Sequence, residues 1–339
     1  MKHPRRYAMD GLKLLFMLLV VIHHSGFLGE TMHHAYMAVD IFFMISGYLL
    51  CQTCMNDAEL SVAGYFFRRL RKLYPHYFLS FVVMLLATSV YRMGGLSREV
   101  LLRAIPEMLL VQNLGFFDGG VNYPCWYLSV LVFASPLLWV LLRHLPVRWF
   151  NGVAIACIFV SYGYILHFAG GSMETFDTVG VFYLPFWRGV AGLLCGMLLH
   201  QLHRKLPLQS THLLQTMQIL ELFALALSVG LMFHPGQVDG VILIGLFVLL
   251  ICSGNPKSVI ERVSNCAAVR WGIRYEYAVF LNHAFVIGMV RKVFGDFLGV
   301  SAPIQFFAVL VFTVIYSVAT QKLVNMSFSL FGNRKKVSV

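Results

Sequence analysis

Residues 10–25 read DGLKLLFMLLVVIHHS, an apolar stretch with one lysine near its start and two histidines near its end. On a helix of about 3.6 residues per turn, the step from Lys13 to His24 makes roughly three turns, so both side chains share one face. At about 1.5 Å per residue they lie roughly 16 Å apart along the axis. Ionisable groups inside an apolar span are costly and usually functional; the alternative is a lysine that reaches the membrane surface and a histidine that only packs. The pair is therefore the first candidate for chemistry.

The composition indicates a chain that uses lipid as the solvent for most of its surface. Of its 339 residues, 59% are hydrophobic and 12% are charged, whereas soluble proteins average about 25% charged residues. The net charge of +11 is better explained by membrane topology than by nucleic-acid binding. Seven cysteines, an odd number, do not indicate a disulfide framework, and we expect Cys51 and Cys54 to pack or face lipid.

Apolar runs long enough to cross about 30 Å of hydrocarbon recur along the chain. We predict an all-α, polytopic membrane bundle of about ten transmembrane helices. The first run is expected to be a retained span, because further spans follow it and not a small-residue cleavage site. The bundle forms one predicted domain over residues 1–330, followed by a basic tail over 331–339. The expected spans lie near 11–29, 35–53, 76–92, 122–142, 150–168, 181–200, 217–234, 238–253, 276–292 and 303–323.

Lysines and arginines gather in alternate connecting segments, which predicts that both termini are cytoplasmic. Basic residues are dense at the N-terminus, in the 54–75 and 254–275 segments and in the tail, whereas Arg92, Arg98, Arg103, Arg291 and Lys292 depart from this pattern. The stretch 98–110 is amphipathic and predicts a short helix on the outer membrane surface.

The second span begins with an acidic residue in the stretch AVDIFFMISGY, residues 38–48. A carboxylate among Phe and Met side chains is costly unless it is paired. Counted inward from the short connection near residue 32, Asp40 and His24 fall at similar depth, so we expect Asp40 to orient His24 as a general base. The alternative is that Asp40 pairs with another, structural partner.

Four cations fall within five residues just before Pro75, in the stretch YFFRRLRKLYPHY, residues 65–77. Such a run is typical of topology signalling. Guanidinium groups also suit phosphate recognition. We expect the run to lie in a loop and Pro75 to open the next helix.

Taken together, these segments resemble membrane acyltransferase family 3, whose members O-acylate bacterial surface polysaccharides and lipid-linked glycans. Its Arg-x10-His element is similar to Lys13 and His24, and its Asp-aromatic-Phe…Ser-Gly element to Asp40, Phe42, Phe43, Ser46 and Gly47. Its Phe-x-x-Arg-Arg…Pro-x-Tyr element resembles Arg68, Arg69, Pro75 and Tyr77. Residues 126–130 and 275–286 resemble two later elements of the family.

The resemblance implies a catalytic His24 and an acyl-coenzyme A donor whose phosphates contact Lys13, Arg68, Arg69 and Lys72. It also implies a bacterial inner membrane. Three positions depart from the family pattern: Lys13 replaces the usual Arg, Leu131 stands where many members have Glu, and the Glu common after Arg188 is missing. Lysine keeps the charge but loses bidentate phosphate geometry.

Arg188 lies inside an apolar span and must pair or face water. It is a candidate acceptor contact together with Trp126 and Tyr183, although Asp40 or Glu107 is an alternative partner. Gly189, Gly192 and Gly196 predict close helix packing. Roles for His76, Glu221 and His283 stay open, since a single histidine or carboxylate in a bundle is more often structural. The spacing of His23, His24, His33 and His34 predicts no metal site.

We therefore predict an integral membrane O-acyltransferase that moves an acyl group, most simply acetyl, from acyl-CoA to a sugar hydroxyl. His24, oriented by Asp40, would deprotonate the hydroxyl or relay the acyl group. No bound cofactor and no nucleic-acid partner is expected, only the acyl-CoA, a glycan acceptor and membrane lipids. O-antigen, capsule and exopolysaccharide remain alternative acceptors. The rival class is a glycan or small-molecule transporter, because buried Asp, His and Arg also suit proton-coupled carriers.

Overall fold

The structure, a computed structural model, describes residues 7–27, 31–91, 97–116, 120–206 and 210–331. Helices account for nearly all of the regular structure in these ranges, and a two-stranded hairpin is added to them. The elements are α1 Tyr7–Ser25, the 3-10 helix η2 Ala35–Met37, α2 Ala38–Asn56, α3 Val62–Tyr91, α4 Arg98–Met108, the 3-10 helix η3 Tyr123–Cys125, α5 Trp126–His144, α6 Val147–Phe168, β1 Thr178–Val179, β2 Phe182–Tyr183, α7 Leu184–His203, α8 Thr211–Leu231, α9 Asp239–Cys252, α10 Val259–Ser264, α11 Ala267–Val290, the π-helix η4 Arg291–Phe297 and α12 Ala302–Phe331.

The predicted all-α, polytopic class is confirmed. Within the described ranges, eight helices are long and apolar enough to cross a membrane. Two further helices match predicted spans. One is α7, with 20 residues, and the other is α9, which has 14 residues and is shorter than a full crossing requires. The basic tail predicted at 331–339 lies almost entirely outside the described residues.

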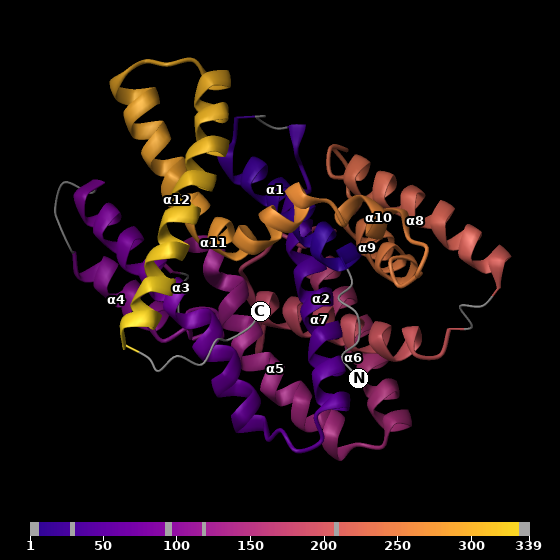
Figure 1. The fold of residues 1–339 in the computed structure, drawn as a ribbon. Helices are drawn as coiled ribbons and strands as arrows, with labels where there is room; N and C mark the ends of the chain where they lie inside the picture. Colours follow the sequence, from indigo (N-terminus) through magenta and orange to yellow (C-terminus); the bar gives the residue numbers. More distant parts are fainter. Residues whose placement is uncertain (1–6, 28–30, 92–96, 117–119, 207–209, 332–339) are drawn as a thin grey trace.

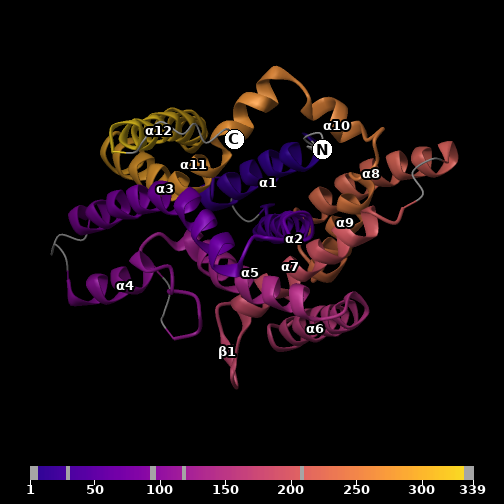
Figure 2. The same cartoon turned by 60° about the horizontal axis from the view of Figure 1, so that its bottom comes forward.

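Helix α2 forms the centre of the bundle, with α1, α5 and α7 around it (Figures 1 and 2). Small residues bring α2 and α7 into close contact. A Cβ added to Gly47 would collide with the carbonyl of Leu193, and one added to Gly196 would collide with the carbonyl of Met44. The close packing predicted from the glycines of the sixth span is confirmed, and it lets two helices with few polar residues approach through their backbones.

Helices α1 and α11 run side by side in the same direction, since Lys13 meets Glu276 and His24 meets His283 further along both helices. The start of α1 is fixed by a carboxylate from another helix. Glu261 of α10 accepts the backbone N–H groups of Tyr7 at 3.1 Å and Ala8 at 2.6 Å. A carboxylate at a helix N-terminus satisfies unpaired donors and complements the helix dipole.

Glu221 fulfils the same purpose for α10. Its side chain is fully buried, and it accepts the hydroxyl of Ser258 at 2.5 Å and the backbone N–H of Val259 at 2.8 Å. Glu221, whose role the sequence left open, is therefore a structural cap.

Helix α3 begins much earlier than predicted. It starts at Val62 and contains Pro75, so the basic run 68–72 lies on a helix and not in a loop, and Pro75 does not open the helix. The missing proline N–H leaves only the carbonyl of Arg71 without its intrahelical donor, and Arg71 is exposed, where water can replace the bond.

The segment between α3 and α5 contains α4, which confirms the short helix predicted over 98–110. Helix α4 lies at the periphery beside α3 in both views (Figures 1 and 2). Between α6 and α7, the hairpin pairs Thr178 with Tyr183 and Val179 with Phe182, and Gly180 turns the chain at φ 63°, a value that favours glycine.

We expect Gly196→Ala to lower the free energy of unfolding by about 1–3 kcal/mol, because the added methyl group forces α7 away from the α2 backbone. The matched control is Gly163→Ala in α6, where an added Cβ meets nothing within 4 Å. That change should be neutral or stabilise by up to about 1 kcal/mol through helix propensity. Thermal unfolding in detergent measures both, and equal effects of the two substitutions would contradict the packing argument.

Candidate functional site

His24 lies at the end of α1 and contacts a second histidine from α11. Its Nδ1 is 2.8 Å from Nε2 of His283, and the two rings are nearly parallel, with 8° between their planes. His283 is fully buried, and its Nδ1 is 2.7 Å from the carbonyl oxygen of Phe280, one helical turn earlier. The sequence left His283 as a weak candidate, because nothing in the pattern shows which histidines meet.

Tyr123 covers another side of His24, with its ring edge-on and the ring centroids 5.0 Å apart. The loop that carries it is held from both sides. Glu107 of α4 accepts the backbone N–H of Asn122 at 3.0 Å, and the Asn122 side chain donates to the carbonyl of Leu281 in α11 at 3.1 Å. Since Tyr123 is 49% exposed, it forms the partly open side of the histidine pair.

Lys13 lies between two carboxylates and is only partly exposed. Its Nζ is 3.0 Å from Glu276 of α11 and 3.1 Å from Asp10, three residues earlier on α1. The sequence did not single out Glu276, although it stands seven residues before His283, about two helical turns, and so shares a face of α11 with it. The lysine expected to contact donor phosphates therefore has two anionic partners inside the protein.

The basic run 68–72 divides between two faces of α3. Arg68, Arg71 and Lys72 are exposed, as expected for positions that follow one another around a helical face. Arg69 instead turns inward and donates to the Tyr65 hydroxyl at 2.7 Å. Arg68 lies 3.8 Å from Asp57 with both side chains largely exposed, so this pair contributes little to stability.

Tyr127 of α5 links the basic residues to the interior. Its hydroxyl lies 2.9 Å from Ser46 and within electrostatic reach of Arg69, Lys13 and Glu276. The Phe280 ring packs against both Tyr127, at 5.8 Å between ring centroids, and His283, at 6.0 Å. The structure thus brings Lys13 and Arg69 towards one centre and keeps it separate from the histidine pair by an aromatic side chain.

The expected contact between Asp40 and His24 is not formed. Asp40 is fully buried and pairs with Arg188, whose Nη2 and Nε lie 2.5 and 3.2 Å from its two carboxylate oxygens. His24 lies near the end of α1 and Asp40 near the start of α2, but a residue count along a helix does not fix the face on which a side chain lies. Asp40 takes the structural alternative that the sequence left open.

Arg188 uses most of its donors within the protein. Besides Asp40, it donates to the carbonyls of Met173 at 2.8 Å and Tyr36 at 3.2 Å. Its guanidinium also lies over the ring of Trp126, at 5.7 Å from the centroid. Glu107, the other partner considered for Arg188, instead contacts Val121 and Asn122. These contacts leave Arg188 few donors for an acceptor.

Trp126 and Tyr183, the two aromatic residues predicted to contact the acceptor, instead contact other residues of the protein. Trp126 is half-buried between Arg188, Phe43 and Phe176. The buried Tyr183 donates its hydroxyl to the side chain of Asn113 at 2.7 Å. Neither contacts His24, so Tyr123 is the aromatic residue at the histidine pair that sequence reasoning missed.

No cluster of three or more His, Cys, Asp or Glu side chains suited to a metal ion occurs among the described residues. All seven cysteines are free. His76 lies on α3 with its ring 6.1 Å from that of Tyr277 in α11.

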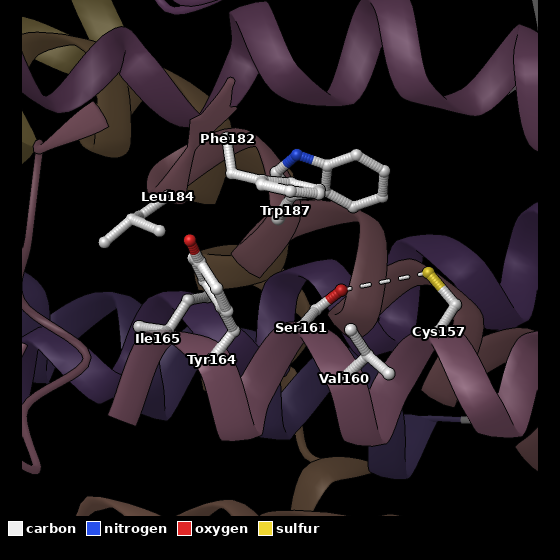
Figure 3. Close-up of a pocket in the computed structure, with 8 residues that line it drawn as sticks. All are labelled: Cys157, Val160, Ser161, Tyr164, Ile165, Phe182, Leu184 and Trp187. Carbon is white, nitrogen blue, oxygen red and sulfur yellow. Dashed lines mark hydrogen bonds between the residues drawn. The ribbon is translucent and has the colours of Figure 1, made fainter. Parts of the chain in front are cut away.

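A pocket of about 160 Å³ opens between α6 and α7, below the hairpin (Figure 3). Its wall is almost entirely apolar, and its one internal hydrogen bond joins Cys157 and Ser161 at 3.8 Å. None of its lining residues is a candidate site residue. They are Cys157, Val160, Ser161, Tyr164, Ile165, Phe182, Leu184 and Trp187.

Comparisons with known proteins agree on the class. A family described as an acyltransferase domain matches residues 6–322. The chain is 25% identical over 297 residues to acyltransferase MdmB of Streptomyces mycarofaciens, which covers 77% of this chain and 70% of MdmB. It is 28% identical over 128 residues to peptidoglycan O-acetyltransferase OatA of Listeria monocytogenes, which covers 36% of this chain and only 20% of OatA. No solved structure matches the chain.

We expect Arg188→Met to lower the free energy of unfolding by about 3–5 kcal/mol, because it leaves the Asp40 carboxylate buried and unpaired. The double variant Asp40→Leu, Arg188→Met removes both charges and should recover most of that loss. Thermal unfolding in detergent measures this, with Arg148→Met on the exposed face of α6 as control. Unchanged stability of Arg188→Met would contradict the structural role and favour acceptor binding.

Burial raises the pKa of Glu107 to about 7, and the N–H groups of Asn122 and Val121 only partly oppose this. Because the folded-state pKa lies above the ordinary value of 4.5, the stability that Glu107 contributes is present below about pH 4.5 and lost as the pH rises through about 7. The loss should reach about 3 kcal/mol.

Thermal unfolding of the protein at pH 5 and pH 7.5 should therefore show a larger pH dependence for the natural chain than for Glu107→Gln. Glu99→Gln, on the exposed face of the same helix, is the matched control. An identical pH dependence in the natural chain and in Glu107→Gln would contradict the raised pKa.

Proposed function

Because this chain belongs to membrane acyltransferase family 3, whose match spans residues 6–322, we propose that it transfers an acyl group from acyl-CoA to a sugar hydroxyl. The acyl group is most simply acetyl, and the acceptor is a surface polysaccharide or its lipid-linked precursor. The observation that carries the proposal is the half-buried His24, at the end of a helical face that begins with Lys13. The similarity to the peptidoglycan O-acetyltransferase OatA, whose acceptor is a glycan, supports the acceptor class.

The donor would arrive at the Lys13 end of α1, and the basic residues in the segments at that end support a cytoplasmic position for it. The membrane would be a bacterial inner membrane, as the family resemblance implies. Arg68 and Lys72 are exposed there and suit the phosphates of coenzyme A, with Arg69 further inward. Since Lys13 already lies between Asp10 and Glu276, its contribution is to line the path of the donor more than to bind a phosphate. The acyl thioester would then extend along the α1–α11 contact towards His24.

The acceptor would approach His24 from the Tyr123 side, because Tyr123 is half exposed whereas Arg188 and Tyr183 are buried. An aromatic ring beside the base suits a sugar ring. His24 would take the proton of the sugar hydroxyl while the oxygen attacks the thioester carbonyl. A C–O bond forms, the C–S bond breaks, and the coenzyme A thiolate leaves and takes up the proton. Such proton transfer contributes about 10²–10⁴-fold to the rate.

The rival function is transport. Buried Asp, Arg and His side chains also occur in proton-coupled carriers. In this chain the buried Asp40 and Arg188 form an ion pair, so their charges neutralise each other. Arg188 also donates to a backbone carbonyl, that of Met173. That arrangement favours a fixed structural pair over a proton relay, and therefore favours the transferase.

We expect His24→Ala to reduce acyl transfer by at least about 10²-fold, because the reaction loses its general base. The assay uses membranes of the producing bacterium with radiolabelled acetyl-CoA and follows label into its own glycans. His144→Ala, an exposed histidine at the end of α5, should keep the natural rate. Full transfer by His24→Ala would contradict the mechanism, and movement of glycan across proteoliposomes without an acyl donor would favour the carrier.

A further inference from the structure

We propose that His283 is a positioning residue that holds His24 in the tautomer whose Nε2 is free to accept a proton. The inference deepens the proposed function and rests on it for the role of His24 as base. It needs no carboxylate partner for His24, a role that Asp40 does not fill because it pairs with Arg188.

The tautomer follows from which atoms are able to donate. The carbonyl oxygen of Phe280 only accepts, so the contact of 2.7 Å requires the proton of His283 on Nδ1. A neutral imidazole with its proton on Nδ1 has a lone pair on Nε2. The contact of 2.8 Å between that Nε2 and Nδ1 of His24 therefore requires the proton of His24 on Nδ1. The remaining ring nitrogen of His24, Nε2, then carries the lone pair.

Both imidazoles are neutral in this arrangement. His283 is fully buried in α11, the rings that contact the pair belong to His23, Tyr123 and Phe280, and among the described residues neither histidine pairs with a carboxylate. A doubly protonated ring would place a cation in an apolar interior without a counter-charge. This cost disfavours a positively charged His283, in which both ring nitrogens would donate.

The open nitrogen of His24 lies where the chemistry needs it. No described residue hydrogen-bonds to Nε2 of His24, and the ring is only half-buried beside the exposed Tyr123. When Nε2 takes the proton of the acceptor hydroxyl, the Nδ1–H stays bonded to His283, and the bond strengthens as the ring becomes positive. A carbonyl and a neutral histidine thus supply the orientation that a carboxylate supplies in other general-base sites.

The direct test is the protonation of each ring nitrogen, read from nitrogen-15 chemical shifts of the full chain labelled on its histidines, at a pH where His24 is neutral. The His24 signals are assigned by their loss in His24→Gln. We expect a protonated Nδ1 and an unprotonated Nε2 in the natural chain, and a shift towards protonated Nε2 in His283→Asn. A protonated Nε2 in the natural chain, or no change in His283→Asn, would overturn the proposal.

Two substitutions separate positioning from packing in the kinetics. His283→Gln places an amide oxygen near the position of Nε2 and keeps an acceptor for His24, whereas His283→Asn keeps only the donor towards Phe280. We expect the Asn variant to lose about 10²–10³-fold in kcat with little change in KM, and the Gln variant to stay within about tenfold. The control His76→Asn, in α3, should keep the natural rate.

Equal losses in the Gln and Asn variants would reduce His283 to a packing residue, and no loss in either would remove it from the reaction. A failure of the proposed function can be told apart from a failure of this inference. If the nitrogen shifts depend on His283 as expected but the natural chain transfers no acyl group, the positioning stands and the reaction assigned to the site is wrong.

Discussion

The cost of placing charge in an apolar interior is the constraint on which this arrangement of helices depends. Asp40 would be untenable at the start of α2 without Arg188 from α7, and Arg188 also satisfies the carbonyls of Tyr36 and Met173. The Asp40–Arg188 ion pair thus links α2 to α7, the two helices whose backbones come close because of Gly47 and Gly196. Polar satisfaction and close packing therefore act on one interface, which makes α2 and α7 a close-packed centre that α1, α5, α6 and α9 contact.

Carboxylates from neighbouring helices fix the position of α1 in a similar way. Glu221 of α8 caps α10, and Glu261 of α10 caps α1. Each carboxylate meets backbone N–H groups that the helix itself leaves unpaired. Helix α1 carries both Lys13 and His24, so this series of caps sets the depth at which the candidate base stands.

Two polar centres share α1 and α11 but differ in character. Around Lys13, charged groups from α1 and α11 compensate one another. Around His24, uncharged groups are ordered by hydrogen bonds to His283 and the carbonyl of Phe280. The ring of Phe280 lies against both Tyr127 and His283 and so stands between them. For the proposed transfer, the charged centre suits an anionic donor, and the uncharged centre suits a base that must be neutral to accept a proton.

Much of the molecule was determined by sequence alone. The lengths of the apolar runs determined the helical membrane fold, because hydrocarbon admits few other structures. The periodicity of a helix placed Lys13 and His24 on one face of α1, and the small residues of α7 predicted its close packing. The tertiary structure decided what those side chains meet. A residue count gives the depth of Asp40 but not its direction, so only the packing of α7 showed that Arg188, and not His24, is its partner. Likewise, the sequence separates His24 from His283 by more than two hundred residues, and only the parallel contact of α1 with α11 brings the two imidazoles together.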